Sequence, residues 1–386
     1  MDRTERRIGQ ALARAAAIFA LAAFLLWAMF PDGDAARIER RAQCYDPARL
    51  PPVIERGDGY RAMRLSILLY NVEGLPFPAR LGRERQLNRI AFWLERRRAA
   101  GQAPDIVFLH KAFTPAASAI AAAGGYGWVL PGPSRDLKRS SAAAAPRPAD
   151  YDAGARWFKG EGIGKWLDSG LYIATDLPLF VRHTAPFSSG ACAGYDCLAN
   201  KGGMVATLII PGVPEPLRLF NTHRNSREPS GVAIARAETA HRIQTMENDR
   251  LLAETMAGPV IAAGDFNMQR AGDRTGHFAS DPGFRLIAPL SGDGTDARSA
   301  AMSDESAWTA LQDLIGVGSG ARVEVVPLAV TSLFDGSRGP RLSDHNATYA
   351  VVELRWRGDT PSLARFAPPP CEGPRGGLTP AHPVPI

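Results

Sequence analysis

The sequence predicts an α/β fold in a single domain, because patterns typical of buried strands and of amphipathic helices alternate along most of its 386 residues. Apolar residues make up 45% of the chain and charged residues 22%, which allows a packed core and excludes a disordered chain. There is no internal repeat and no clear inter-domain linker, so one domain is a simpler interpretation than the two or three that the length alone allows. The formal net charge of +6 is too small to indicate a nucleic-acid partner by itself.

The predicted elements follow one another in a clear order. The first buried strand is expected over residues 64–70, and residues 83–98 form an amphipathic helix with arginines on its exposed face. A second buried strand covers residues 105–109, whereas residues 134–150, rich in Ala, Arg, Ser and Pro, are typical of a flexible loop. A long helix is expected over residues 231–256, and further strands at residues 170–174, 203–210, 217–221, 259–264, 322–330 and 347–354.

The two ends of the chain differ from this pattern. The domain is expected to cover residues 62–356, between a polar lead-in (37–61) and a Pro-rich tail (357–386). Residues 1–36 combine four arginines among the first 14 residues with an apolar run over residues 15–30. A basic flank before an apolar run is typical of a signal peptide or signal anchor, with a buried helix as the alternative. Export would place the domain in the periplasm or outside the cell, anchored to the inner membrane if the segment is not cleaved.

The four cysteines fit an oxidising compartment, where an even number of cysteines usually forms disulfides. Cys192 and Cys197 lie five residues apart in a Gly-rich segment, so a local bond is their natural pairing. Cys44 and Cys371 then remain, and a bond between them would join both ends of the domain. A zinc site is the alternative, although no His-rich spacing accompanies these cysteines.

Polar side chains lie next to several predicted strands, in positions where burial is unfavourable without a function. Each short motif alone is a common turn former, but the whole set in this order is specific. The residues are, in chain order, Asn71 and Glu73 of Asn-Val-Glu-Gly-Leu-Pro, His223 of Asn-Thr-His, Asp265 and Asn267 of Gly-Asp-Phe-Asn, and Asp344 and His345 of Ser-Asp-His.

This set resembles the endonuclease/exonuclease/phosphatase superfamily, which includes deoxyribonuclease I, apurinic/apyrimidinic endonucleases, inositol polyphosphate 5-phosphatases and neutral sphingomyelinases. The resemblance covers residues 62–356 and is greatest to the bacterial and neutral sphingomyelinase branch. The segments that carry it are Asn-Val-Glu-Gly-Leu-Pro, Asp196-Cys-Leu-Ala-Asn-Lys201-Gly and Asn-Thr-His. It implies a deoxyribonuclease I-like four-layer sandwich, in which two mixed β-sheets are flanked by helices and strand ends from both sheets form the site.

The resemblance also implies roles in phosphodiester hydrolysis, which needs an activated water, a neutralised phosphate charge and a protonated leaving oxygen. His345 matches the general base, and Asp313 matches the carboxylate that orients it. His223 matches a second histidine that stabilises the phosphoryl oxygens or assists the leaving group. Further matches are Asp265 and Asn267 for positioning water, metal or phosphate, Asn71 for a phosphate contact, and Asp344 with Glu73 for the surroundings of a Mg²⁺ ion.

One position departs from the family pattern. The second buried strand ends in Gln-Glu in the family, and that Glu is the principal Mg²⁺ ligand, but here His110 and Lys111 follow the strand. A lysine has three donors and no acceptor, so a protonated Lys111 cannot bind Mg²⁺. Only five of the 45 Lys and Arg residues are Lys, so drift to Lys is less expected here than drift to Arg.

Three interpretations of Lys111 remain open. In the first, its ammonium takes the place of the metal and binds the phosphate. In the second, the protein has lost catalysis and kept phosphate binding. In the third, the strand register differs and another carboxylate binds the metal. Lys201 is the other lysine within a motif, and it belongs either to the site or to a solvated strand start.

We therefore predict an exported or membrane-anchored phosphodiesterase of the sphingomyelinase type, acting on a phosphoester such as a phospholipid headgroup. One alternative is a catalytically impaired protein that binds phosphate or lipid headgroups. Another is an exported nuclease whose basic groove comes from the arginine face of residues 83–98, although such faces are more often solvated. A divalent cation, Mg²⁺, is expected from the resemblance, and Lys111 argues against it.

Overall fold

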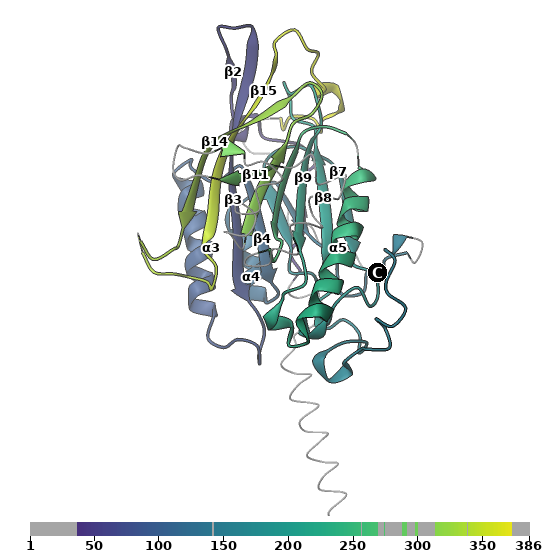
Figure 1. The fold of residues 1–386 in the computed structure, drawn as a ribbon. Coiled ribbons are helices and arrows are strands. Elements are labelled where there is room, and N and C mark those ends of the chain that lie inside the picture. Colours follow the sequence, from purple (N-terminus) through teal and green to yellow (C-terminus); the bar gives the residue numbers. More distant parts are fainter. Residues whose placement is uncertain are drawn as a thin grey trace, which may run out of the picture.

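The computed structural model describes residues 37–140, 143–255, 257–268, 274, 288–291, 298–299, 313–337 and 339–372. In these residues two mixed β-sheets pack face to face. Helices α3 (Glu84–Ala99) and α4 (Pro115–Ala123) cover the outer face of one sheet, and α5 (Ile234–Ala253) covers the outer face of the other (Figure 1). The predicted α/β sandwich is therefore confirmed.

The first sheet contains the two strands that were easiest to predict, β3 (Tyr60–Gly74) and β4 (Ile106–Ala112). They are parallel neighbours, joined by a crossover through α3, and the other pairs in this sheet are antiparallel. The strand order is β1 (Arg40–Arg41), β5 (Trp128–Pro131), β6 (Tyr172–Thr175), β4, β3, β15 (Ala347–Arg357) and β14 (Glu324–Leu333), with β2 (Val53–Glu55) also paired to β3.

The second sheet has the same arrangement around β9 (Leu217–His223) and β10 (Val260–Asp265), which are parallel and joined through α5. Its other pairs are antiparallel. The strand order is β12 (Arg298–Ser299), β11 (Ala288–Ser291), β13 (Asp313–Gly318), β10, β9, β8 (Gly202–Leu208) and β7 (Leu179–Pro186).

The main hydrophobic core lies between the sheets, and its pattern explains where the polar residues gather. Side chains alternate between the two faces of a strand, so every second residue of the central strands points into this core. At one end of each strand the same face becomes polar. Two positions along the strand from the last core residue, the side chain on this face is polar. The polar residues are Asn71 after Leu69, Asn221 and then His223 after Leu219, Asp265 after Ala263, and Asp313 before Ile315.

The segments outside the predicted domain also pack onto it. The lead-in (37–61) contributes β1 and β2, and Tyr45 N donates to Pro369 O at 3.0 Å in the first part of the tail. Both predicted disulfides, Cys44–Cys371 and Cys192–Cys197, are confirmed, and they occupy all four cysteines.

Residues 134–150, expected to be a flexible loop, contain no named helix or strand among their described residues. The segment is nevertheless tied to the domain, because Ala145 is buried and its N–H donates to Glu247 Oε1 at 3.1 Å. Ala145 therefore packs against the domain.

The predicted export segment (1–36) and the tail residues from 373 onward lie outside the described residues. Within the described part, no helix is long and apolar enough to cross a membrane.

Candidate active site

The polar strand ends of both sheets meet at one end of the sandwich. Asp313, at the start of β13, pairs with Asp265 at the end of β10, which also neighbours His223 at the end of β9. Asn71 pairs with His110 across β3 and β4 of the other sheet. The structure brings together eight of the nine residues predicted to be catalytic, phosphate-binding or metal-binding: Asn71, Lys111, His223, Asp265, Asn267, Asp313, Asp344 and His345.

His345 and Asp313 form a carboxylate–imidazole pair. His345 Nδ1 lies 2.7 Å from Asp313 Oδ2, and both side chains are buried. Burial alone would raise the pKa of Asp313, but the His345 and His110 imidazoles outweigh it and hold the pKa below its ordinary value. Asp313 is therefore ionised and can only accept, so Nδ1 of His345 carries the hydrogen and Nε2 bears the lone pair of a general base.

The two groups nearest to His345 Nε2 are hydrogen-bond donors, as a lone pair requires, and Asp344 Oδ1 lies farther away, at 3.9 Å. Asn71 Nδ2 lies 3.3 Å from Nε2 and also donates to Asp265 Oδ2 at 3.0 Å. Lys111 Nζ lies 3.4 Å from the same nitrogen. Burial lowers the pKa of His345, but the charge and hydrogen bond of Asp313 outweigh it, so the pKa is raised above its ordinary value. The base is thus oriented by one carboxylate and capped by two donors.

His223 sits on the other side of Asp265, with its Nε2 3.4 Å from Asp265 Oδ2 and 3.1 Å from Lys201 Nζ. Burial, and then the charges of Lys201 and Lys111, hold the pKa of His223 well below its ordinary value. Burial raises the pKa of Asp265, and the neighbouring Asp313 adds to the effect. His223 is therefore uncharged at neutral pH, and the positive charge on this side of the site comes from Lys201.

Lys201 is buried directly before β8 and belongs to the site. Its ammonium contacts the Asp196 carboxylate and His223, and donates to Arg224 O at 3.0 Å. Asp196 Oδ2 in turn accepts from Ser226 N at 2.9 Å. Of the two interpretations of this lysine, the structure therefore favours the site over a solvated strand start.

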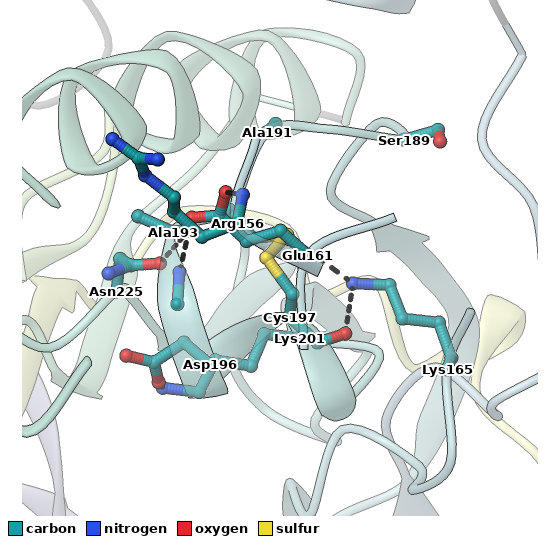
Figure 2. The surroundings of a disulfide bond; sticks show 12 residues. Arg156, Glu161, Lys165, Ser189, Ala191, Ala193, Asp196, Cys197, Lys201 and Asn225 are labelled. Atoms are coloured by element: carbon teal, nitrogen blue, oxygen red, sulfur yellow. Dashed lines mark hydrogen bonds and ion pairs between the residues drawn. A yellow bond between two sulfur atoms is a disulfide. The ribbon is translucent and has the colours of Figure 1, made fainter. Parts of the chain in front are cut away.

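The Cys192–Cys197 disulfide holds the loop that carries Asp196 (Figure 2). Lys165 reaches this loop from a neighbouring segment: its Nζ donates to Cys197 O at 2.9 Å and lies 3.8 Å from Cys192 Sγ. Burial lowers the pKa of Lys165 to about 8. Lys165 and the disulfide thereby hold the loop, and its Asp196 contacts Lys201.

Glu73, expected near a metal, has other partners here. Its carboxylate contacts the guanidinium groups of Arg80 and Arg83, and its Oε2 accepts from Asp344 N at 3.0 Å. Asp344 itself is less buried, with Oδ2 3.7 Å from Lys111 Nζ. Glu73 thus positions the Asp344 backbone and forms ion pairs with two arginines.

Part of this set lines a cavity of about 770 Å³, and we refer to this polar part of the lining as the floor. The polar part of its lining includes Lys111, Lys201 and His345. The remaining wall is mainly apolar, and its larger members are Leu75, Phe77, Phe113, Trp166, Leu167, Tyr195 and Leu198. A ligand of this cavity would therefore place a polar group on the floor and an apolar group against the wall.

The resemblance implies a divalent cation, and the residues can be tested for one. Asp265, Asp313 and His345 each offer one ligand atom, and these atoms lie within 4.8 Å of one another, a spacing that could hold a metal ion. However, His345 directs Nδ1 to Asp313 and Nε2 to Lys111. A metal ion bound to either nitrogen would therefore have to displace Asp313 or Lys111 from the histidine. The donor set as arranged therefore does not fit Mg²⁺.

Electrostatics agrees with this conclusion. At an effective dielectric constant of about 20, unit charges about 4 Å apart repel by about 4 kcal/mol, and a divalent ion beside an ammonium by about twice that. An ion bound at His345 Nε2 would lie close to Lys111 Nζ, which is 3.4 Å from that nitrogen. Lys111 would have to move away before a divalent cation could bind.

His110 is a site residue whose role the sequence did not reveal. It is fully buried, its Nε2 lies 2.6 Å from Asn221 Oδ1, and its Nδ1 lies 3.7 Å from Asp313 Oδ1. Asn221 Nδ2 donates to Tyr172 O at 2.9 Å, so Asn221 Oδ1 is the acceptor and His110 Nε2 the donor. His110, on β4 of the first sheet, therefore donates to β9 of the second sheet and places its ring beside Asp313. The only sequence signal was its place directly before Lys111 at the end of a buried strand.

Solved structures share this fold. Beta toxin from Staphylococcus aureus matches with a TM-score of 0.50 and 14% identity, over 74% of this chain and 99% of its own. A variant of it, solved with bound magnesium ions, has a TM-score of 0.49 at 15% identity, over 75% and 99%. Sphingomyelinase C from Streptomyces griseocarneus matches with 0.48 at 20% identity, over 75% and 99%. An endonuclease/exonuclease/phosphatase from Bacteroides vulgatus matches with 0.46 at 15% identity, over 76% and 99%.

No protein-family model and no curated protein matches the chain. The fold is a deoxyribonuclease I-like α/β sandwich, as the resemblance implied.

Proposed function

We propose that this protein is a phosphoester hydrolase of the phosphodiesterase type, in which His345 activates the attacking water. The observation that carries the proposal is the orientation of His345. Its Nδ1 is bound to the ionised Asp313, and its Nε2 faces the floor of a cavity that is also lined by the ammonium groups of Lys111 and Lys201. A base beside two cations is suited to water attack on an anionic ester.

In the proposed reaction, the water oxygen forms a bond to phosphorus while the bond from phosphorus to the leaving oxygen breaks. The water proton passes to His345 Nε2, and the Asp313 carboxylate stabilises the imidazolium that results. The leaving oxygen keeps the electron pair of the broken bond and takes a proton from solvent. Asn267, which lines the floor, donates a hydrogen bond to a phosphoryl oxygen. Lys201, whose N–H groups already contact Asp196, His223 and Arg224 O, contributes its positive charge.

The cavity wall supports a substrate with an apolar part. Phe77, Phe113 and Trp166 line the same cavity as the charged residues of the floor. A phospholipid presents a phosphodiester next to an apolar moiety, which matches both parts of the lining. We therefore propose a phospholipid headgroup as the substrate class, in agreement with the sphingomyelinase-like motifs of the sequence.

We also propose that the domain acts outside the cytoplasm, with residues 1–36 as its export signal or anchor. Two disulfides support an oxidising compartment. Fusion of a periplasm-dependent alkaline phosphatase to the carboxyl end of the chain tests this proposal. An active fusion is expected, and a fusion that is made but inactive would contradict export.

Loss of catalysis with retained phosphate binding is the second candidate, because Lys111 replaces the expected metal ligand. The nuclease alternative has less support. The arginine-rich helix α3 covers the outer face of its sheet, and it contributes none of the described residues that line the cavity.

Hydrolysis of bis-p-nitrophenyl phosphate and of a choline phospholipid by the purified full chain tests the proposal. We expect activity with at least one of them, and a loss of at least about 100-fold in His345→Ala, because a positioned base contributes about that much. His183→Ala, which changes an exposed histidine of β7 that does not line the cavity, is the matched control. Absence of activity, or equal activity of the His345→Ala and His183→Ala proteins, would refute the proposal.

A further inference from the structure

The ammonium of Lys111 lies at the centre of the candidate site. Its Nζ is 3.4 Å from His345 Nε2 and 3.7 Å from Asp344 Oδ2, and 17% of the side chain is exposed. We propose that this ammonium binds the phosphoryl group and supplies the positive charge that the resemblance assigns to Mg²⁺, so that hydrolysis needs no divalent cation. The inference rests on the proposed function and specifies how its site works.

The backbone is irregular at the point that aims Lys111 into the site. Regular alternation along β4 would place Lys111 on the same face as Val107 and Leu109, which pack against the outer helices. Lys111 instead has φ 52°, in the left-handed region that side chains rarely adopt, and Glu73 opposite it has φ 53°. The register between β3 and β4 shifts at this place, as in a β-bulge.

This irregularity has a consequence for function. Bulges re-aim side chains, and left-handed non-glycine residues gather at functional sites because the conformation is unfavourable elsewhere. Here it turns a lysine away from an apolar layer and toward His345 and Asp344. A lysine that only filled space or remained solvated would not need this conformation.

The hydrogen-bonding capacity of the ammonium leaves room for a ligand. An ammonium has three N–H donors, and within the described residues Lys111 Nζ has two polar contacts, at 3.4 and 3.7 Å. Both contacts are longer than the 2.7–2.9 Å typical of charge-assisted hydrogen bonds. An anionic phosphoryl oxygen is a stronger acceptor than a neutral imidazole, so a bound substrate would draw the ammonium toward itself.

That movement would also release the base. In the free site the lone pair of His345 Nε2 faces Lys111 and Asn71, the latter at 3.3 Å. When the Lys111 ammonium turns to the phosphoryl oxygen, His345 Nε2 becomes available to a water molecule. Lys111 would thus couple binding of the substrate to activation of the nucleophile, which a resident metal ion bound to His345 would not do.

Two measurements test the inference. The first is hydrolysis of bis-p-nitrophenyl phosphate by the full chain after removal of metals with EDTA, and again with added Mg²⁺ or Mn²⁺. The second is binding of Mn²⁺ alone, followed by electron paramagnetic resonance, which does not depend on activity. Both are made on the unaltered protein, on Lys111→Met and on Lys111→Glu, with thermal unfolding to show that each variant is folded.

We expect the unaltered protein to keep its activity within about twofold in EDTA and to bind no Mn²⁺ at millimolar concentration. Lys111→Met should lose about 100- to 1000-fold, as when a group that stabilises developing charge is removed. Lys111→Glu should bind Mn²⁺. The matched control Lys138→Glu makes the same charge change at an exposed lysine, and it should match the unaltered protein in both measurements.

The contrary results separate the two proposals. Activity that disappears in EDTA and returns with Mg²⁺, or Mn²⁺ binding by the unaltered protein, would overturn the inference and leave the proposed hydrolase standing. A protein that is inactive in every condition, but becomes active with metal in Lys111→Glu, would overturn the inference and establish the impaired enzyme. Inactivity of all these proteins would overturn the proposed function itself.

Discussion

Replacement of Asp313 by Asn tests the pairing of the base directly. The carboxylate lies 2.7 Å from His345 Nδ1, and at an effective dielectric constant of about 20 an imidazolium and a carboxylate at this distance attract by about 6 kcal/mol. The amide of Asn keeps part of this attraction as a hydrogen bond. We therefore expect the transition state to lose about half of the attraction, or about 3 kcal/mol of stabilisation. This corresponds to a fall in kcat of at least about 100-fold.

The pH dependence adds a second readout for Asp313→Asn. Hydrolysis needs the neutral imidazole, and because Asp313 raises the pKa of His345, the rate of the unaltered protein should rise with pH through a midpoint above 6.5. Without the Asp313 carboxylate, burial and the nearby Lys111 lower the pKa of His345. Asp265 raises the same pKa, but it offsets only part of this decrease. The acid limb of kcat/KM should therefore move to lower pH.

The assay is hydrolysis of bis-p-nitrophenyl phosphate, followed from about pH 5 to about pH 9. Asp136→Asn is the matched control, because that carboxylate is 85% exposed. A kcat for Asp313→Asn within threefold of the unaltered protein, with the acid limb in the same place, would refute the pairing of His345 and Asp313 as the basis of activity.

Three further substitutions are informative. Lys201→Met should raise the pKa of His223, because the ammonium 3.1 Å from Nε2 is removed while burial remains, and an unchanged imidazole titration by NMR would contradict this. His110→Leu leaves its acceptor on β9 unpaired and should lower the free energy of unfolding by about 1–3 kcal/mol, whereas His110→Gln keeps a donor and should cost less; equal losses in urea denaturation would count against this role. Joint replacement of Cys192 and Cys197 by Ser opens a short loop and should lower the free energy of unfolding by about 2 kcal/mol while weakening hydrolysis, and no change in either quantity would contradict its role in holding the site.

The parts of the fold that could be predicted were those with long buried runs. The strands that became β3, β4, β9 and β10 contain consecutive apolar residues, and their positions were found to within a few residues. The short helix α4 was missed, although Thr114 caps it by accepting from Ala117 N and Pro115 occupies its first position. Its nine mostly small residues give a weak helical pattern, and its packing against β3 and β4 supplies the stability.

Strands at or near sheet edges were also harder to predict. β7 is only half-buried along most of its length, and β5 has four residues, so neither shows a clear period. β13 begins at Asp313 and includes two glycines, which lower the strand propensity of a short segment. Their places in the sheets depend on neighbours that lie far away in the sequence.

The candidate site was predicted well where a polar residue continues the inner face of a strand. His223 and Asp265 lie at such ends, because the alternation that buries the preceding residues carries them into the same layer. The aim of Lys111 could not be predicted, because it depends on a left-handed residue and a shifted register. The partners of Glu73 could not be predicted either, because Arg80 and Arg83 reach it through the fold of the segment that follows.

The central claim is that His345 activates water to cleave a phosphoester, and hydrolysis in ¹⁸O-labelled water tests it most directly. Mass spectrometry of the products from bis-p-nitrophenyl phosphate shows which bond is broken. The account predicts one ¹⁸O atom in the phosphate product and none in the alcohol, at a rate that falls at least about 100-fold in His345→Ala. Label in the alcohol, or labelled phosphate formed equally fast without His345, would contradict it.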